Sequence, residues 1–344
     1  GIVAGVCIPG NSTGAPVAWM TTAANHNQRS LSGLSAGVAC DVFGIANSGS
    51  VIGSCLDQMG VPFAVPWAGP SVVPLKLAPL SGILGIDVQV RTTPKAFNQA
   101  GFVAGQSVAF DGSTTAAIWQ PNTGVALLVS SSSDNCEVAA INDDPSGGLP
   151  NVLLNCPNPA GTTTAKLATP TGLLRTYISN PPVVPAGSAY CIAKGINSAS
   201  QVVGSCIYPS SPFSQTAIWA TPTASPSVLT LPGFAGDVIG KRNEGRFIND
   251  AGHVVFSYQT DTGGDGVGYL DLTSMPVFVP SLDPGASISA VGFGNNDRIV
   301  VVGDNASGNK QAAVFDPSSP TVLSPIAQLP GGTNTVLKSV SRSG

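Results

Sequence analysis

The feature that most constrains this chain is an internal repeat with a period of roughly 50 residues. Each copy has an Asn-rich turn followed by a short apolar run that ends near a Gly. The clear copies are IANSGSVIGS from Ile45, FNQAGFVAGQS from Phe97, INSASQVVGS from Ile196, INDAGHVVFS from Ile248 and NNDRIVVVG from Asn295. Because a unit of this size cannot bury its own apolar face, the repeat predicts a fold of similar, stacked modules.

Two more copies depart from this pattern. INDDPSGGLPNVLLN from Ile141 carries four extra residues, and a seventh copy is split between VSRSG from Val340 and GIVAGVC from Gly1. If the strand over 333–343 pairs beside the strand over 2–7, one sheet is built from both chain ends. Such a closure removes the exposed strand edges that an open solenoid would present to other chains.

A second recurring segment is a strand with an aromatic residue at a fixed place. It reads APVAWM from Ala15, TTAAIWQP from Thr114, SQTAIWATP from Ser214, GVGYLDL from Gly266 and KQAAVFDP from Lys310. The alternation of apolar and polar residues is typical of β-strands. Four short strands per unit and seven units predict an all-β, seven-bladed β-propeller with four-stranded antiparallel blades, forming a single domain over residues 1–344. The alternative, an open β-solenoid, usually repeats at a shorter period.

The composition fits many short strands joined by tight turns. Of the 344 residues 43% are hydrophobic and only 9% are charged, and the chain contains 41 Gly and 29 Pro. A net charge of −4 gives no electrostatic basis for binding nucleic acid, which requires neutralisation of phosphates by Lys and Arg. No apolar stretch approaches the roughly 20 residues that a membrane-spanning helix needs. Since the chain begins at Gly1, we expect a mature or trimmed form.

Six of the seven cysteines flank the turns in pairs. Cys40 and Cys55 flank the second turn, Cys136 and Cys156 the fourth, and Cys191 and Cys206 the fifth. In each pair one Cys lies on the strand entering the turn and the other on the strand leaving it, which places the side chains opposite each other across a hairpin. Three disulfide bonds imply an oxidising compartment, so we expect a secreted, cell-surface or periplasmic protein. Buried free thiols are the alternative, and Cys7 has no evident partner.

The pattern IN-x-x-G-x-VVG-x-S followed by A-x-W resembles the bacterial extracellular repeat family called HAF repeats. The best matching segments run from Phe97 to Trp119 and from Ile196 to Trp219, and the resemblance covers nearly the whole chain. It implies secretion and a propeller-like fold. The motif is structural, so the resemblance assigns no reaction and no active-site residue.

Residues suited to catalysis are sparse. Of the two histidines, His26 lies in a polar loop and His253 stands where other copies carry Phe102 or Gln201, and no G-x-S-x-G motif is present. The segment TDTGGDGVG suggests a calcium loop in which Asp261 and Asp265 supply oxygen ligands, although it lacks the other acidic positions of an EF-hand. A polar hairpin tip is the alternative interpretation.

Basic residues recur at equivalent positions on the strand that enters the turn. Three positions before the Asn of the turn stand Lys95, Lys194, Arg246 and Lys338, where the remaining copies have Phe43, Ala139 and Phe293; four residues earlier stand Arg91 and Arg242. We call these six cations the cationic collar. If the entering strand is the innermost one, the collar lines a channel and holds an anionic group. Otherwise these side chains are solvated strand ends.

Two functions agree with this pattern. The first is a secreted, non-enzymatic propeller that serves as a binding or structural module for a protein or glycan partner on the cell surface or in an extracellular assembly. The second is an extracellular enzyme that acts on polysaccharides, with its site at the channel mouth. Because the recurring positions are structural and catalytic residue types are few, we expect the first.

Overall fold

The computed structural model describes most of the chain. The described residues are 4–7, 17–21, 28–36, 38–69, 72–80, 89–144, 147–159, 161–171, 176–180, 182, 184, 186–209, 211–229, 242–259, 263–326, 337, 339 and 342–343. Contacts divide the chain into two compact units, residues 1–161 with 166–180 and residues 162–165 with 181–344, and each unit is described by itself. The single domain over residues 1–344 stays a prediction.

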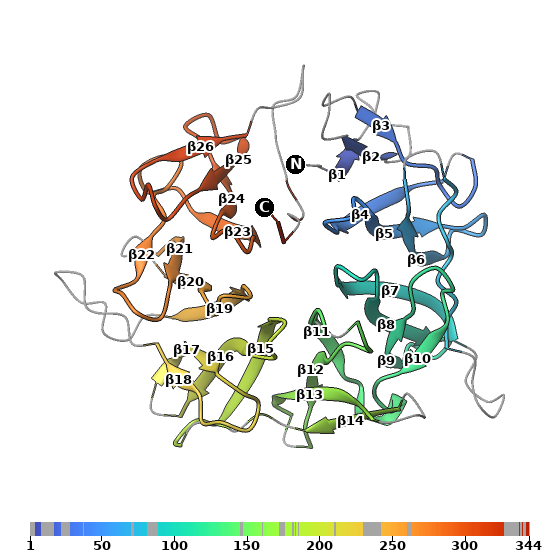
Figure 1. The fold of residues 1–344 in the computed structure, drawn as a ribbon, viewed down its shortest axis with the longest axis horizontal. Coiled ribbons are helices and arrows are strands. Elements are labelled where there is room, and N and C mark those ends of the chain that lie inside the picture. Colours follow the sequence, from blue (N-terminus) through green and yellow to red (C-terminus); the bar gives the residue numbers. More distant parts are fainter. Residues whose placement is uncertain are drawn as a thin grey trace. The chain divides into compact units, whose positions relative to one another are not determined.

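The first unit holds four blades (Figure 1). Blade 1 is β1 (Ala4–Cys7), β2 (Val17–Thr21) and β3 (Gln28–Ser30), and blade 2 is β4 (Cys40–Ile45), β5 (Val51–Leu56) and β6 (Pro62–Trp67). Blade 3 is β7 (Gln89–Phe97), β8 (Val103–Ala109), β9 (Thr114–Trp119) and β10 (Ala126–Leu128). A 3-10 helix, η1 (Ser132–Asp134), leads into blade 4, which is β11 (Glu137–Ile141), β12 (Val152–Pro157), β13 (Thr163–Thr171) and β14 (Thr176–Asn180).

The second unit holds three blades. Blade 5 is β15 (Tyr190–Ile196), β16 (Val202–Tyr208), β17 (Ser211–Trp219) and β18 (Ser227–Val228). Blade 6 is β19 (Asn243–Ile248), β20 (Val254–Gln259), β21 (Asp265–Leu270) and β22 (Val277–Phe278). Blade 7 is β23 (Ile288–Phe293), β24 (Ile299–Asp304), β25 (Lys310–Phe315) and β26 (Leu323–Pro325).

Each blade is an antiparallel meander in which consecutive strands pair. In the described part of the chain, five sheets have four strands and the sheets of blades 1 and 2 have three. The chain is therefore an all-β protein built of seven antiparallel β-propeller blades, as the repeat predicts. None of the helices in the described residues is long and apolar enough to cross a membrane.

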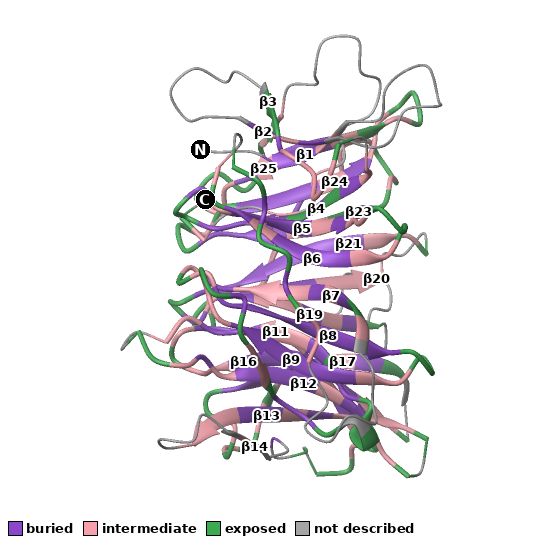
Figure 2. Cartoon of the chain, turned by 90° about the vertical axis from the view of Figure 1, so that its right-hand side faces the viewer, coloured by how far each residue is buried: buried purple, intermediate pink, exposed green. Residues whose placement is uncertain are grey.

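The core lies between neighbouring blades. Figure 2 shows the buried residues concentrated on the strands and the exposed residues at the connections. The recurring aromatic residue of the third strand supplies the largest buried side chains of this core: Trp67, Trp119, Trp219 and Phe315 are each completely buried. Apolar residues of neighbouring blades pack against one another; for example, Val255 of blade 6 and Ile299 of blade 7 belong to one buried cluster. This packing between blades explains why one repeat cannot fold alone.

The first strand of each blade, called the inner strand below, is the one that neighbours its counterparts. Within the first unit β1 contacts β4, β4 contacts β7, and β7 contacts β11; within the second, β15 contacts β19 and β19 contacts β23. Figure 1 shows these strands side by side within each unit. Within each unit the entering strand is therefore the inner strand, a point that the sequence analysis left open.

A β-bulge interrupts the inner strand of blades 2 to 7 at one equivalent residue. The register shifts pass over Phe43, Lys95, Ala139, Lys194, Arg246 and Val291. The assignment of Phe293 to this position is wrong, because Gly294 and not Asn296 occupies the Asn position of the last turn. The Gly294 amide donates to the Arg298 carbonyl just as the Asn249 amide donates to the His253 carbonyl.

The Asn of each turn explains the repeat motif. Asn98, Asn142, Asn197 and Asn249 are buried, and each Oδ1 accepts a hydrogen bond from the amide that opens the second strand. The Nδ2 of Asn98 donates to the Asn142 carbonyl at 3.1 Å, and that of Asn197 donates to the Asn249 carbonyl at 2.9 Å. All four Asn residues therefore close their own turns, and Asn98, Asn197 and Asn249 also bond the turn of the next blade.

The next residue in each turn extends this connection. We call these residues the turn row: Asn47, Gln99, Asp143, Ser198, Asp250 and Asn295. Four of the six backbone N–H groups donate to the side-chain oxygen of the row residue in the following blade, from Asn47 to Gln99, Gln99 to Asp143, Ser198 to Asp250 and Asp250 to Asn295. The motif that defines the repeat in sequence is thus a chain of hydrogen bonds between blades.

Three disulfide bonds join the inner strand, or in blade 4 the residue just before it, to the second strand. They are Cys40–Cys55 in blade 2, Cys136–Cys156 in blade 4 and Cys191–Cys206 in blade 5, each with 4.1 Å between the Cα atoms. All six cysteines are buried. The predicted pairs and the hairpin argument behind them agree with the structure.

The two halves of the predicted closing blade have different outcomes. Arg342 and Ser343 form a turn. The Arg342 carbonyl accepts a hydrogen bond from the amide of Asn295, the turn-row residue of blade 7. The tail therefore supplies a turn, as the split copy predicts. The predicted strand over 333–343 falls mostly outside the described residues, and its pairing with β1 stays a prediction.

Candidate functional site

The cationic collar lies on inner strands, at the bulge and at the strand entrance. Lys95 and Lys194 are half-buried at the bulges of blades 3 and 5, and Arg91 is exposed. Lys338 lies outside the described residues. Since Arg91 and Lys95 belong to one unit and the other described members to the second, the collar as a common anion site stays a prediction.

Two collar arginines are already paired with carboxylates of blade 6. Arg246 lies 3.2 Å from Glu244 and donates from Nε to Ser257 Oγ at 3.1 Å. Arg242 lies 2.8 Å from Asp265, and both side chains are about half exposed. An anionic ligand would have to compete with these ion pairs, which weakens the collar as a binding site.

The ion pair between Arg242 and Asp265 also bears on the predicted calcium site. Asp265 is the acidic partner of Arg242, and the positive guanidinium opposes a cation at that carboxylate. Asp261 lies outside the described residues. In the part of the chain that the structure describes, no group of three or more His, Cys, Asp or Glu side chains is arranged to hold a metal ion. Calcium binding by Asp261 and Asp265 stays untested.

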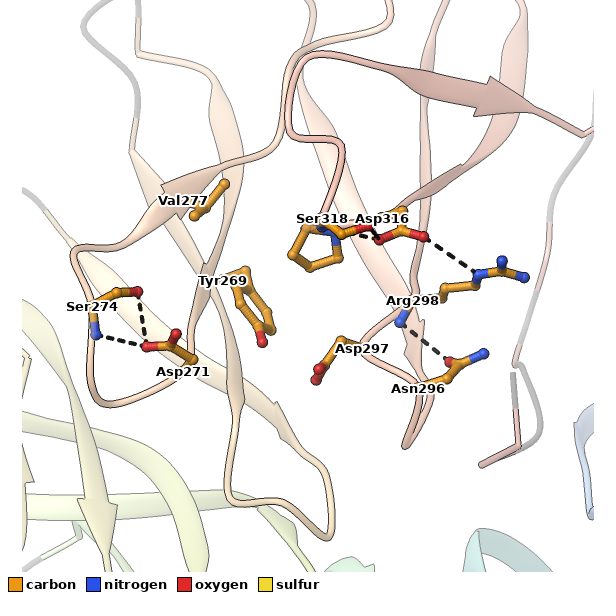
Figure 3. A pocket seen from close by; sticks show the side chains of 10 residues that line it. Tyr269, Asp271, Ser274, Val277, Asn296, Asp297, Arg298, Asp316 and Ser318 are labelled. Carbon is orange, nitrogen blue, oxygen red and sulfur yellow. Dashed lines mark hydrogen bonds and ion pairs between the residues drawn. The ribbon is translucent and has the colours of Figure 1, made fainter.

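A cleft lies between blades 6 and 7 of the second unit. Its volume is about 640 Å³. Figure 3 shows polar side chains from both blades around it. The lining residues are Tyr269, Asp271, Ser274 and Val277 from blade 6 and Asn296, Asp297, Arg298, Asp316, Pro317 and Ser318 from blade 7.

The carboxylates of this cleft are held in place by short local hydrogen bonds. Asp271 Oδ1 accepts from the Thr273 amide at 2.9 Å, and from the amide and hydroxyl of Ser274 at 2.7 and 2.8 Å. These bonds, that from the Thr273 amide first, lower the pKa of Asp271 to about 2. Asp316 accepts from the Ser318 hydroxyl at 2.6 Å, and this bond lowers the pKa of Asp316. Both carboxylates are therefore ionised at neutral pH and act as hydrogen-bond acceptors.

Asp297 is fixed from the back of the cleft by blade 6. Its Oδ1 lies 2.6 Å from His253 Nδ1 and accepts from Asn249 Nδ2 at 2.8 Å. The Tyr269 hydroxyl lies 3.0 Å from the same His253 nitrogen, with the two rings edge to face. Burial and then the Asp297 charge raise the pKa of Tyr269, so the phenol stays protonated and can donate a hydrogen bond. His253, which lies just before β20, therefore takes part in the contact between blades 6 and 7.

The cleft residues are the places where blades 6 and 7 depart from the repeat. By strand register Tyr269 stands where blades 3 and 5 have Ile118 and Ile218, while Leu270 takes the Trp position. Asp297 stands where blades 2, 3 and 6 have Gly49, Gly101 and Gly252. His253 replaces Phe102 and Gln201. In a repeat protein the shared residues serve the fold, so a cluster of departures around one cavity marks a site with another purpose.

Sequence reasoning did not find this cleft. Each departure is visible in the aligned copies, but the copies alone do not say that residues near 253, 270, 297 and 316 meet. The segments near residues 253 and 270 belong to blade 6, and those near 297 and 316 belong to blade 7. Only the packing of blade 6 on blade 7 brings them together.

Comparison with known proteins rests on structure. No protein-family model matches the chain, and no curated protein sequence matches it. The β-propeller domain of the Trilobed protease from Pyrococcus furiosus superposes with a TM-score of 0.58 at 11% identity, covering 95% of this chain and 94% of that one. The fold is that of a β-propeller.

Two further structures agree. A post-proline cleaving enzyme from Rickettsia typhi matches with a TM-score of 0.61 at 10% identity over 97% of this chain. The chain spans about half of that enzyme, 52% of its length. A protein from Lactobacillus plantarum matches with a TM-score of 0.51 at 12% identity, covering 99% of this chain and 98% of that one. At such low identity these likenesses show the fold alone.

Proposed function

We propose that this protein is an extracellular binding module whose ligand site is the cleft between blades 6 and 7. The observation that carries the proposal is the cleft of about 640 Å³, lined by fixed polar side chains at positions where the repeat is broken. Its size lies within the range of small-ligand sites, which is roughly 300–1,000 Å³. The three disulfide bonds support an oxidising compartment, and the resemblance to HAF repeats supports secretion.

The chemistry of the cleft favours a glycan as the ligand. Asp271, Asp297 and Asp316 present acceptors for hydroxyl groups, Asn296 and Arg298 present donors, and Tyr269 adds an aromatic ring with a polar tip. Because the local hydrogen bonds already hold Asp271 and Asp316, little side-chain entropy is lost when a ligand binds. The site has the form of a preorganised, hydrogen-bonding receptor.

A glycan array followed by calorimetry on the best ligand tests this function. The informative variants restore the residue that the chain itself uses in other blades: Tyr269→Ile as in Ile118, Asp297→Gly as in Gly101, and Asp316→Gln as in Gln120. We expect each to weaken binding about tenfold or more, the loss of one or two good hydrogen bonds. Asp111→Asn, on an exposed hairpin tip of blade 3, is the matched control and should leave affinity unchanged.

Two results would contradict the proposal. Glycan binding that all three variants retain would place the ligand elsewhere. Conversion of the bound glycan to product, abolished by Asp271→Asn or Asp316→Asn, would favour the polysaccharide-acting enzyme instead.

A further inference from the structure

The tail of the chain makes a three-blade contact through a single residue. Arg342 Nη1 lies 3.0 Å from Asp250 Oδ1 of blade 6, and Nη2 donates to the Ile196 carbonyl of blade 5 at 3.2 Å. The Arg342 carbonyl accepts from the Asn295 amide of blade 7 at 2.6 Å. One arginine therefore bonds all three blades of the second unit.

The groups that receive this arginine are positioned by the fold. Asp250 Oδ1 accepts from the Ser198 amide at 2.9 Å, and Asp250 Oδ2 accepts from Asn295 Nδ2 at 2.6 Å. Burial alone would raise the pKa of Asp250, but the bond from Ser198 and the charge of Arg342 bring that pKa below its usual value. The carboxylate is thus ionised and held in one orientation by two neighbouring blades.

The turn row explains why the backbone amide of Asn295, the last described row residue of this unit, needs a hydrogen-bond acceptor. In this unit the Ser198 amide donates to the side chain of Asp250 in the next blade, and the Asp250 amide donates to the side chain of Asn295. No row residue of a further blade follows Asn295 in the described part of this unit, and its amide donates to the main-chain carbonyl of Arg342. The surface therefore offers a carboxylate and a carbonyl for a guanidinium, and an amide for the peptide carbonyl of the same residue.

We propose that the turn surface formed by Ile196, Asp250 and Asn295 is a recognition site for an arginine residue of a peptide, which the chain's own tail occupies in cis. The planar guanidinium donates from two nitrogens in a fixed geometry, so it reaches the carboxylate and the carbonyl together. A lysine ammonium on a flexible stem does not match this pair of acceptors as well. The site lies apart from the blade 6–7 cleft, because none of the three residues lines that cleft.

Chemical rescue of the full chain carrying Arg342→Ala tests the proposal. We expect this variant to lose about 2–5 °C in thermal midpoint, since charge-assisted bonds are removed from a part-buried site. Added N-acetyl-arginine amide should bind the vacated site and raise the midpoint in a saturable way. N-acetyl-lysine amide should need at least tenfold higher concentration, and the wild-type chain, whose site is filled, should not respond.

The double variant Asp250→Ala with Arg342→Ala is the specificity control, and it should show no rescue. Should Arg342→Ala fold poorly, Arg342→Lys keeps the charge and the main-chain bond and serves in the same assay. The inference is wrong if the arginine probe fails to stabilise either single variant, or if it stabilises the double variant or the wild type equally. Glycan binding at the cleft is read separately on the same proteins, so failure of one proposal does not imply failure of the other.

Discussion

At the scale of the residue, the buried Asn of each turn does more than shape that turn. Asn197 is fully buried, accepts from the Gln201 amide at 2.9 Å and donates to the Asn249 carbonyl at 2.9 Å and to Gln201 Oε1 at 2.7 Å. A buried amide of this kind must find partners for its donors and acceptor, and the neighbouring turn provides one of them. The residue identity is therefore set jointly by two blades.

Asn197→Ala should lower the free energy of unfolding by about 2–3 kcal/mol, because buried groups of Gln201 and Asn249 lose their partners. Urea denaturation measures the change. Blade 2 carries Ala46 at the same position, buried and with its amide bonded to the Ser50 carbonyl, so alanine itself fits the turn.

Ala199→Ser, an exposed change in the same turn, is the control and should stay within about 0.5 kcal/mol of the wild type. Equal stability of the Asn197→Ala variant and the wild type would show that the bond between turns contributes nothing.

At the scale of the element, the bulge of the inner strand lies beside a glycine of the second strand in blades 2, 3 and 5. Gly53, Gly105 and Gly204 face the residue that precedes the bulge, and a Cβ on any of them would lie 2.0 to 2.1 Å from a carbonyl oxygen of the inner strand. In these three blades the Gly that ends the apolar run of the sequence motif is thus required by close backbone approach. Blade 6 instead has Gly245 on the inner strand, opposite Phe256.

Gly204→Ala should destabilise the protein by about 2 kcal/mol or more, because the methyl group overlaps the Ile192 carbonyl oxygen and the strands must separate. Gly69→Ala is the matched control, since nothing lies within 4 Å of an added Cβ there, and it should be nearly neutral. Thermal unfolding of both variants under one condition decides the comparison, and similar midpoints would contradict the steric argument.

At the scale of the whole molecule, stability comes from many similar contacts between blades and from covalent links within three of them. The disulfide bonds of blades 2 and 5 each span 15 residues and that of blade 4 spans 20. In the chain-entropy account a closed loop of about 15 residues stabilises the folded state by about 3 kcal/mol, through the unfolded ensemble. An oxidising compartment would therefore add to the stability of the whole chain.

Replacing Cys191 and Cys206 together by Ala should reduce the free energy of unfolding by about 2–4 kcal/mol in oxidising buffer. In a reducing buffer the wild type should fall further, toward the sum of three such losses, whereas the double variant has only two bonds left to lose. Guanidinium denaturation in both buffers measures these differences. A wild type whose midpoint is the same in both buffers would show that the bonds do not contribute.

The sequence by itself determined the number of blades, the order of the strands and the three cysteine pairs. The repeat makes each blade a local meander, and the cysteines lie on strands joined by one turn, so these contacts are short in sequence. The repeat left open which strand of a blade is the inner one, because this depends on how the blades pack. The aligned copies also misplaced one position, Phe293 for Val291, because the turn of blade 7 has Gly294 where the turns of blades 2 to 6 have Asn or Ala.

Only the tertiary structure decided the contacts between blades. The cleft unites Tyr269 of blade 6 with Asp316 of blade 7, and the tail site unites Asp250 with Arg342, which is 92 residues away along the chain. The sequence marks such residues as departures from the repeat, but their meeting depends on how one sheet packs on the next. Side-chain packing between sheets fixes these distances, and the pattern of a single blade does not contain it.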